Sequence, residues 1–180
     1  MKIIVFGASN SKKSINKRFA TYASTFFHDN DVEILDLNDF ALPVFSVDLQ
    51  AENGIHENGI RFYDKLQSAD LIIVSMAEHN GSYTAAFKNL LDWMSRYESK
   101  VFGNKPMLLL STSPGGRGGK GVMDAALVRF PIHGAEIIEH FSLPKFNENF
   151  DDEQGITDPV LKAEFEQAVG KVKSSVALTS

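Results

Sequence analysis

The sequence predicts an α/β protein with a doubly wound, five-stranded parallel sheet, strand order 2-1-3-4-5, and helices on both faces. Short apolar runs alternate along the chain with stretches whose apolar residues recur every three or four positions, as they do on one side of a helix. Three of the runs are apolar throughout, which is typical of strands buried on both faces of a parallel sheet. We expect residues 1–180 to form a single domain, because a chain of this length suffices for one packed core.

The predicted strands differ in how apolar they are. Glu33 and Glu136 interrupt the second and the fifth, which suits edge strands, because one side of an edge strand meets water. The first, third and fourth are uninterrupted, so we expect them in the centre of the sheet. The five strands are predicted at residues 3–6, 32–35, 71–74, 107–110 and 135–138.

Helices are predicted between the strands and after the last one. Ser14 is placed to cap the first helix. Residues 38–58 are the least regular part of the chain and are expected to form a long functional or interface loop, whereas residues 173–180 are expected to fray. The five helices are predicted at residues 14–27, 60–66, 83–94, 122–130 and 160–172.

Composition excludes several classes of function. Lys and Arg number 18 against 23 Asp and Glu, and the net charge of −5 offers no long-range attraction to nucleic acid or anionic membranes. Cysteine is absent, which removes disulfides, thiolate metal sites and cysteine nucleophiles, and no metal site is predicted. No apolar run approaches the roughly 20 residues that span a bilayer, and no secretory leader is visible, so we expect a soluble, cytoplasmic protein.

Residues 7–16, between the first strand and the first helix, are predicted to bind phosphate. Exposed N–H groups and the positive end of the helix dipole attract an anion at such a junction. Lys12 and Lys13 add positive charge at its mouth. The hydroxyls and the amide that could donate hydrogen bonds there belong to Ser9, Ser11, Ser14 and Asn16.

Two nucleotide-binding motifs match in part and are rejected. The pattern G-x-x-x-x-G-K-[ST] would align Gly7 with Lys13, but Lys12 occupies its second glycine position and no strand ends in a magnesium-binding Asp. Residues 116–121 fit G-x-G-x-x-G, with Glu136 at 20 residues from Gly116. That segment follows the fourth strand instead of opening the first βαβ unit, so we interpret the match as accidental.

Residues 75–83, after the third strand, are predicted to contact a planar ring. Asn80-Gly81 provides a turn that exposes backbone amides, which can bind the polar edge of a heterocycle. His79 is either a solvated loop side chain or a neighbour of that ring, since it lies beside the switch point of the sheet. Trp93, in the helix that follows, is interpreted as a core or interface aromatic residue.

Residues 111–119, after the fourth strand, carry glycine at four of their last five positions. Such a backbone can approach a ligand closely, although simple flexibility would also explain the cluster. Arg117 and Lys120 either neutralise a second, phosphorylated substrate or are solvated charges on the loop.

Together these segments resemble the NADPH-dependent FMN reductase family, flavodoxin-like flavoproteins that include quinone, azo-compound and chromate reductases. Residues 7–16 resemble the family's phosphate loop, G-S-x-R-x-x-S-x-N, with Ser9, Ser14 and Asn16 in register. Ser11 replaces the frequent arginine, and one additional residue separates the glycine from the serine.

The other two segments carry the rest of the resemblance. Residues 77–82 are similar to the P-E-Y-N-G-S loop that contacts the isoalloxazine, with Ala77 for proline and His79 for tyrosine. Residues 87–93 match the L-K-N-x-x-D-W helix after it except at the first position, and residues 111–119 match S-x-S-P-G-G-x-G-G.

The resemblance implies a flavodoxin-like fold and an FMN-dependent NAD(P)H oxidoreductase. Hydride would pass from NADPH or NADH to FMN and on to free flavin, a quinone, an azo compound or a metal oxyanion. The flavin performs this chemistry, so no catalytic side chain is predicted, with His79 as a candidate modulator. Arg117 is the candidate contact for the nicotinamide substrate. The predicted FMN contacts are Ser9, Ser11, Ser14, Ile15, Asn16, Glu78, His79, Asn80, Gly81, Ser113, Gly115 and Gly116.

The resemblance also implies a homodimer or homotetramer in which a neighbouring subunit closes the flavin site, with residues 38–58 and the Trp93 helix as candidate contacts. Two other functions remain open at this stage. One is a flavodoxin-type electron carrier without nicotinamide turnover. The other is a non-enzymatic flavin-binding or regulatory protein, suggested by the departures at Ala8, Ser11, Ala77 and His79.

Overall fold

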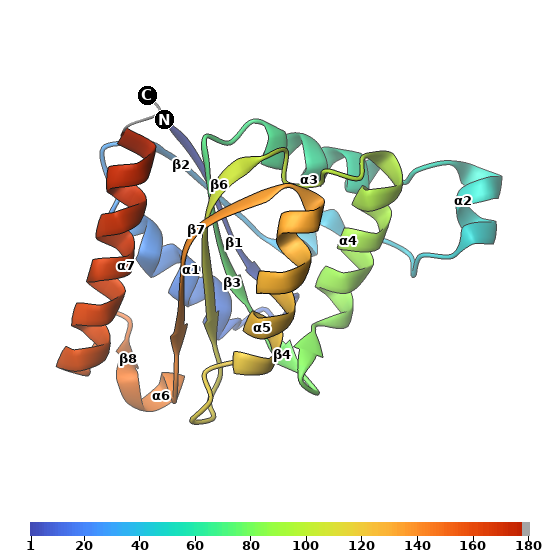
Figure 1. Ribbon diagram of the computed structural model, residues 1–180. Coiled ribbons are helices and arrows are strands. Elements are labelled where there is room, and N and C mark those ends of the chain that lie inside the picture. Colours follow the sequence, from blue (N-terminus) through green and yellow to red (C-terminus); the bar gives the residue numbers. More distant parts are fainter. Residues whose placement is uncertain (178–180) are drawn as a thin grey trace.

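The computed structural model describes residues 1–177 and contains a five-stranded parallel sheet of order β2-β1-β3-β6-β7 (Figure 1). When only the five strands of this sheet are numbered along the chain, this is the predicted order 2-1-3-4-5. The two predicted edge strands lie at the edges of the sheet. The strands are β1 (Lys2–Ala8), β2 (Asp31–Leu35), β3 (Leu71–Met76), β6 (Lys105–Thr112) and β7 (Ala135–Leu143).

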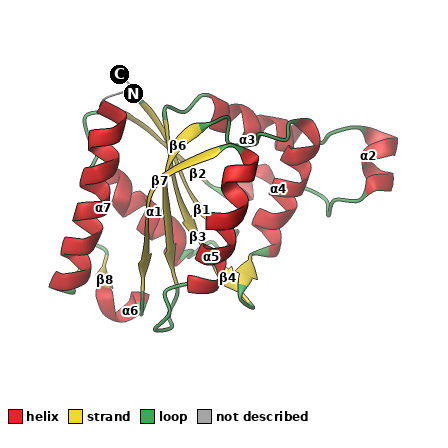
Figure 2. Cartoon of the chain, in the orientation of Figure 1, coloured by secondary structure: helices red, strands yellow, loops and turns green. Residues whose placement is uncertain are grey.

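Helices cover both faces of the sheet, as predicted (Figure 2). On one face, α1 (Ile15–Thr25) and α7 (Pro159–Ala177) contribute to an apolar cluster that includes Ile3 and Val5 of β1. On the other, α3 (Glu57–Gln67), α4 (Ala85–Tyr97) and α5 (Lys120–Arg129) contribute to a second cluster that includes Ile4 and Phe6. Because successive side chains of a strand point to opposite faces, one uninterrupted apolar strand supplies both layers.

A close approach fixes where α1 begins relative to the sheet. Gly7, the next-to-last residue of β1, lies against the first turn of α1, and a Cβ on Gly7 would overlap the backbone of Lys17. The helix therefore lies directly on the strand, which is the reason glycine is needed at this position. The N-terminal end of α1 is thereby placed at the carboxyl edge of the sheet, drawn at the bottom of Figure 1.

Three segments have a different structure from the one predicted. Residues 38–58 are not an irregular loop, because they contain most of a 3₁₀ helix, η1 (Leu37–Phe40), then α2 (Val47–Asn53) and the start of α3. Residues 173–177 continue α7 and do not fray, since Val176 is buried in the core; residues 178–180 lie outside the described part. Tyr83 precedes the helix it was assigned to and belongs to a hairpin.

The remaining elements are short and lie around the sheet. None of the helices in residues 1–177 is long and apolar enough to cross a lipid bilayer. The short elements are the hairpin strands β4 (Glu78–His79) and β5 (Ser82–Tyr83), the 3₁₀ helix η2 (Phe130–His133), α6 (Phe146–Asn149), and the second hairpin, β8 (Phe150–Asp151) and β9 (Gly155–Ile156).

Candidate functional site

The three predicted loops meet at one cavity of about 200 Å³ at the carboxyl ends of β1, β3 and β6. It is smaller than the roughly 300–1,000 Å³ pocket of a whole drug-sized ligand, so it can enclose only part of a nucleotide. The rest of such a ligand would lie on the exposed rim. The lining residues are Ser9, Ser11, Lys13, Ser14, Ile15, Asn16, Ala77, Glu78, His79, Thr112, Ser113 and Pro114.

The first turn of α1 presents hydrogen-bond donors to this cavity. Ser14 is the N-cap, as predicted, and its Oγ accepts a hydrogen bond from the Lys17 N–H over 3.1 Å. Within the described chain, the N–H groups of Ile15 and Asn16 have no acceptor. Lys13, at the mouth, is exposed and forms no ion pair with any described residue. An anion here would meet free donors, the helix dipole and a free cation.

Asn16 is buried and its side chain is largely committed within the protein. Its Oδ1 accepts from Ser75 Oγ at 2.7 Å and from the Thr112 N–H at 3.1 Å, and its Nδ2 donates to the Thr112 carbonyl at 3.1 Å. These bonds tie the start of α1 to β3 and β6. Asn16 therefore positions the loop of residues 7–16, and only its backbone N–H and one remaining Nδ2 hydrogen are left for a ligand.

The second loop forms a tight β-hairpin, and the predicted turn at Asn80-Gly81 is confirmed. Both residues have positive φ, 52° and 75°, as a two-residue type I′ turn requires. The Glu78 carboxylate accepts from the Val122 N–H at 2.8 Å and so caps α5, whose N-cap Gly119 has no side chain. The hairpin is thus fixed to α5 while His79 stays exposed at the cavity.

Tyr83 anchors the same hairpin to the apolar core. Its ring lies 5.8 Å from that of Phe87 and 6.0 Å from that of Phe130, both buried. Burial raises the pKa of the Tyr83 phenol, and its buried hydroxyl has no hydrogen-bond partner among the described residues. The hydroxyl therefore stays neutral at physiological pH.

The third loop combines constrained and unconstrained glycines. Gly118 and Gly119 have φ of +58° and +78°, and a Cβ on Gly118 would stand 2.9 Å from the Leu143 backbone. Gly115 and Gly116 have neither constraint, because neither has a positive φ. A Cβ on Gly116 would meet nothing within 4 Å, and one on Gly115 would make only an ordinary contact with Ser113 Oγ at 3.8 Å. Their lack of side chains leaves the rim beside Ser113 open to a flat ligand.

Sequence reasoning missed two residues that hold the rim together. Thr84 is buried, caps α4 through the Phe87 N–H at 3.2 Å, and donates its Oγ1 hydrogen to the Ala8 carbonyl at 2.9 Å. Thr112 donates its Oγ1 hydrogen to the Leu143 carbonyl at 2.7 Å. A threonine directly before an apolar helical stripe is a cap signal that could have revealed Thr84; the partners of Thr112 leave no such signal.

Three further predicted residues are placed as follows. Arg117 is exposed and forms no ion pair with any described residue. Lys120 pairs with Asp124 at 2.9 Å on α5, which favours the solvated reading of its charge. Trp93 is 1% exposed and its Nε1 donates to the Pro43 carbonyl at 2.8 Å, so it is a core residue within one chain, as one of its two interpretations held.

This fold, with three converging loops at the carboxyl edge and free N–H donors on the first helix, defines a flavodoxin-like nucleotide-binding protein. Residues 1–148 match the model of the NADPH-dependent FMN reductase family. The chain therefore belongs to the NADPH-dependent FMN reductases. It is an oxidoreductase of the NAD(P)H-dependent FMN and quinone reductase class, with FMN as cofactor and NAD(P)H as co-substrate.

Individual relatives agree with the family. The chain is 31% identical over 147 residues to an NADPH:quinone oxidoreductase of Arabidopsis thaliana, covering 77% of this chain and 70% of the relative. It is 30% identical over 125 residues to a quinone reductase of Pseudomonas putida, covering 68% and 66%.

Solved structures show the same fold. A flavoenzyme NAD(P)H:(acceptor) oxidoreductase from Paracoccus denitrificans superposes with a TM-score of 0.72 at 22% identity, covering 96% of this chain and 97% of that one. An NADH:FMN oxidoreductase in its apo form gives 0.72 at 18% identity, covering 97% and 89%.

The residues of the cavity fit FMN. Its phosphate requires several donors and positive charge, which the first turn of α1 and Lys13 offer. Its flat ring requires a rim without side chains, and Gly115 and Gly116, next to Ser113 and Pro114 of the cavity wall, provide one; a Cβ on Gly116 would meet nothing within 4 Å. Ser14, Ile15 and Asn16 would hold the phosphate, and the hairpin and third loop the ring.

Proposed function

We propose that the protein is a reductase in which FMN sits with its phosphate at the start of α1 and its ring between the β4–β5 hairpin and residues 113–116. Bound FMN supplies the hydride chemistry, accepting hydride from NADPH or NADH and reducing a small acceptor such as free flavin, a quinone, an azo compound or a metal oxyanion. The observation that carries the proposal is the pair of free N–H groups on Ile15 and Asn16 at the wall of the cavity.

The hairpin has a defined task in this proposal. Its type I′ turn exposes the amides around Asn80 and Gly81, and the Glu78 link to α5 keeps them in place. Donors fixed before the reaction stabilise negative charge on the reduced ring without reorganising. His79, exposed at the same edge, modulates that charge, and Arg117 carries a free positive charge for the nicotinamide substrate.

Replacing Ser14 with Asp tests the phosphate position. Asp is as good an N-cap as Ser, so α1 keeps its cap and the fold is retained, while a negative charge enters the phosphate site. Two unit charges 4 Å apart repel by about 4 kcal/mol near a protein surface, so we expect FMN affinity to fall at least tenfold after partial screening. The readout is fluorescence quenching of FMN titrated with protein.

Ser174→Asp is the control, because it adds the same charge at an exposed serine of α7, away from the cavity. It should leave FMN affinity unchanged. If Ser14→Asp also binds FMN normally, the phosphate lies elsewhere and the proposed site is wrong.

Anaerobic mixing with NADPH distinguishes the reductase from an electron carrier. Bleaching of the yellow flavin absorbance within the mixing experiment supports hydride transfer from the nicotinamide. A flavin that stays oxidised would favour a flavodoxin-type carrier, and a purified protein that takes up no FMN would favour a regulatory role.

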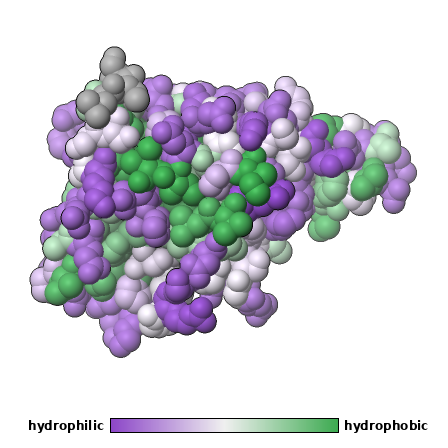
Figure 3. All heavy atoms as spheres, viewed as in Figure 1, coloured by the Kyte–Doolittle hydropathy of each residue, from purple (hydrophilic) through white to green (hydrophobic). Residues whose placement is uncertain are grey.

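An oligomer is also proposed, because the segment around α2 projects from the body and exposes hydrophobic residues (Figures 1 and 3). α2 has no buried residue, and Val44 and Val47 are 83% and 68% exposed. A two-turn helix without buried contacts gains little from its own chain. Trp93 does not contribute to this surface, since it is buried beneath Pro43.

A further inference from the structure

The α2 arm, residues 43–53, is held in its projecting position by side chains of α4. The Phe45 N–H donates to Asn89 Oδ1 at 2.8 Å, and Trp93 Nε1 donates to the Pro43 carbonyl at 2.8 Å. In Figure 1, α4 lies between α2 and α5, so the arm points away from the rest of its own chain. An occupant that covers the arm therefore has to come from another molecule.

The surface of the α2 arm carries an apolar row beside an acidic row. Val47 and Ala51 are four positions apart, and so are Asp48 and Glu52, so each pair lies along one side of the helix. All four side chains are exposed, and neither carboxylate forms an ion pair with any described residue. Residues 43–53 contain no Lys or Arg. A complementary surface would combine exposed apolar side chains with free positive charge.

Such a surface, the α5 patch, consists of Lys100, Val128, Arg129 and Ile132. Val128 is 73% exposed and Ile132 is 55% exposed, and Figure 3 shows an apolar area over this part of the molecule. Lys100 Nζ donates to the Ile132 carbonyl at 3.1 Å, and Arg129 follows Val128 in the chain. Neither cation forms an ion pair with any described residue. The carboxylate of Glu98 accepts from the Lys100 N–H at 3.1 Å, and the two cations outnumber it.

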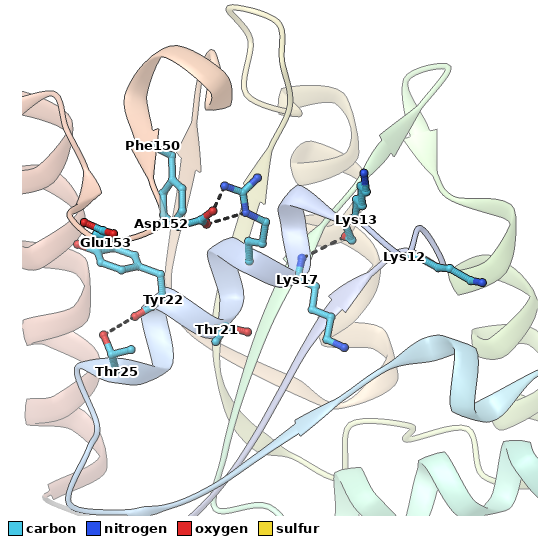
Figure 4. A pocket seen from close by; sticks show the side chains of 11 residues that line it. Lys12, Lys13, Lys17, Thr21, Tyr22, Thr25, Phe150, Asp152 and Glu153 are labelled. Carbon is cyan, nitrogen blue, oxygen red and sulfur yellow. Dashed lines mark hydrogen bonds and ion pairs between the residues drawn. The ribbon is translucent and has the colours of Figure 1, made fainter.

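The other basic surface, a cleft of about 740 Å³ along α1, fits the arm less well (Figure 4). Lys17 is paired with Asp36 at 2.6 Å, and Arg18 is paired with Asp152 at 2.7 Å. Phe150 in its wall is half-buried, and no described residue of the lining is a large apolar side chain with an exposed surface. The cleft therefore lacks the apolar row that the arm requires.

We propose that two copies of this chain exchange their α2 arms, each arm docking on the α5 patch of the other copy. The apolar row of the arm covers Val128 and Ile132, and the acidic row faces Lys100 and Arg129. Each chain has one arm and one patch, so a two-fold axis closes both contacts at once. The inference rests on the oligomer proposed above and makes it specific by naming the surface that receives the arm.

Cross-linking tests this contact directly, because the chain contains no cysteine and introduced thiols have no background. FMN-loaded Val47→Cys and Val128→Cys proteins are mixed, left to exchange subunits and treated with a short bismaleimide. The mixture should give more covalently joined two-chain product than either protein alone. The matched control replaces the second protein with Val160→Cys, whose side chain is 64% exposed on α7, and should give no such increase.

Charge reversal tests the pairing of the two rows. The arm variant Asp48→Lys, Glu52→Lys and the patch variant Lys100→Glu, Arg129→Glu should each weaken association about tenfold, because like charges then face each other. Combining all four substitutions in one chain should restore association. Lys162→Glu on α7 is the control and should have no effect. Light scattering over a concentration series measures association, and the fluorescence of the single buried tryptophan checks that each variant is folded.

The proposal is overturned if the protein is a monomer at every concentration, if the control pair cross-links as well as the test pair, or if the combined variant is folded but stays dissociated. Failure of the proposed reductase function is read separately, as a flavin that stays oxidised after anaerobic mixing with NADPH. The molar mass and the cross-linked product report on the arm contact whichever way that experiment ends.

Discussion

Replacing Asn16 with Ala should destabilise the fold strongly, although Asn16 stands at a ligand-binding loop. The substitution removes three buried hydrogen bonds, to Ser75 Oγ and to the backbone N–H and carbonyl of Thr112. Each contributes about 1 kcal/mol net, and Thr112 keeps buried polar groups without a partner, so the expected loss is about 3 kcal/mol. For a domain of this size that lowers Tm by about 6–12 °C.

Urea unfolding followed by fluorescence measures this loss, because Trp93 is the sole tryptophan and is buried. Asn53→Ala is the control: it removes an exposed amide from α2 and should change stability by less than about 0.5 kcal/mol. A double-mutant cycle with Ser75→Ala should show that Asn16 and Ser75 do not act independently. If Asn16→Ala loses FMN affinity but less than about 1 kcal/mol of stability, Asn16 is mainly a ligand contact and the positioning role is refuted.

Three further outcomes are expected. Glu78→Ala should cost about 1 kcal/mol in urea unfolding by uncapping α5, and Glu78→Gln, which retains an acceptor, less; equal losses would contradict the cap. The hydrogen bond from Lys65, 2.6 Å away, holds the pKa of the Glu33 carboxyl below its ordinary value, so this pair stabilises the fold above about pH 4.5 and the gain is lost as pH falls through the lowered pKa. Tm measured from pH 6 to 3 should fall more steeply for wild type than for Glu33→Gln, by the equivalent of about 0.5 kcal/mol at this partly exposed site; parallel curves would exclude the contribution. Val47→Asp should lower the molar mass seen by light scattering after size exclusion, whereas an unchanged mass would remove α2 from any interface.

The sheet could be predicted because its signal is local. Residues 71–74 are apolar at every position, and a strand of that kind has to be covered on both faces. Glu33 and Glu136 interrupt the apolar runs of the two edge strands, where a charged side chain can reach water. The turn at Asn80-Gly81 was equally predictable from the sequence, because few residue pairs tolerate positive φ at two consecutive positions.

The helix boundaries were harder, since polar residues decide them. α2 has no apolar stripe facing a core, and nothing in its pattern distinguishes it from a loop except Ser46, whose Oγ caps it. Tyr83 continues the apolar period of α4 but pairs in β5, because Thr84 caps the helix one residue later. Apolar periodicity alone does not locate the end of a helix, which depends on the capping residue.

The sequence predicted which loops form the site, but not the buried hydrogen bonds that hold those loops in place. Asn16 and Thr112 are 96 residues apart, and no spacing in the sequence links them. The hydrogen bonds between Asn16 and Thr112, together with the one from Thr84 to Ala8, fix three loops to one another. Because these groups are buried, losing one partner leaves the other unsatisfied at a large cost in stability.

These hydrogen bonds explain why the rim of the cavity keeps its position although it contains exposed glycines. Gly116 forms no hydrogen bond with any described residue, yet the residues on either side are held in place: the Gly115 carbonyl accepts from the Lys145 N–H at 2.9 Å, and Gly118 packs on Leu143. A short open stretch between two fixed points stays near its place while leaving a flat ligand room to approach. Binding then requires little ordering of the loop, which is the condition under which weak backbone contacts give useful affinity.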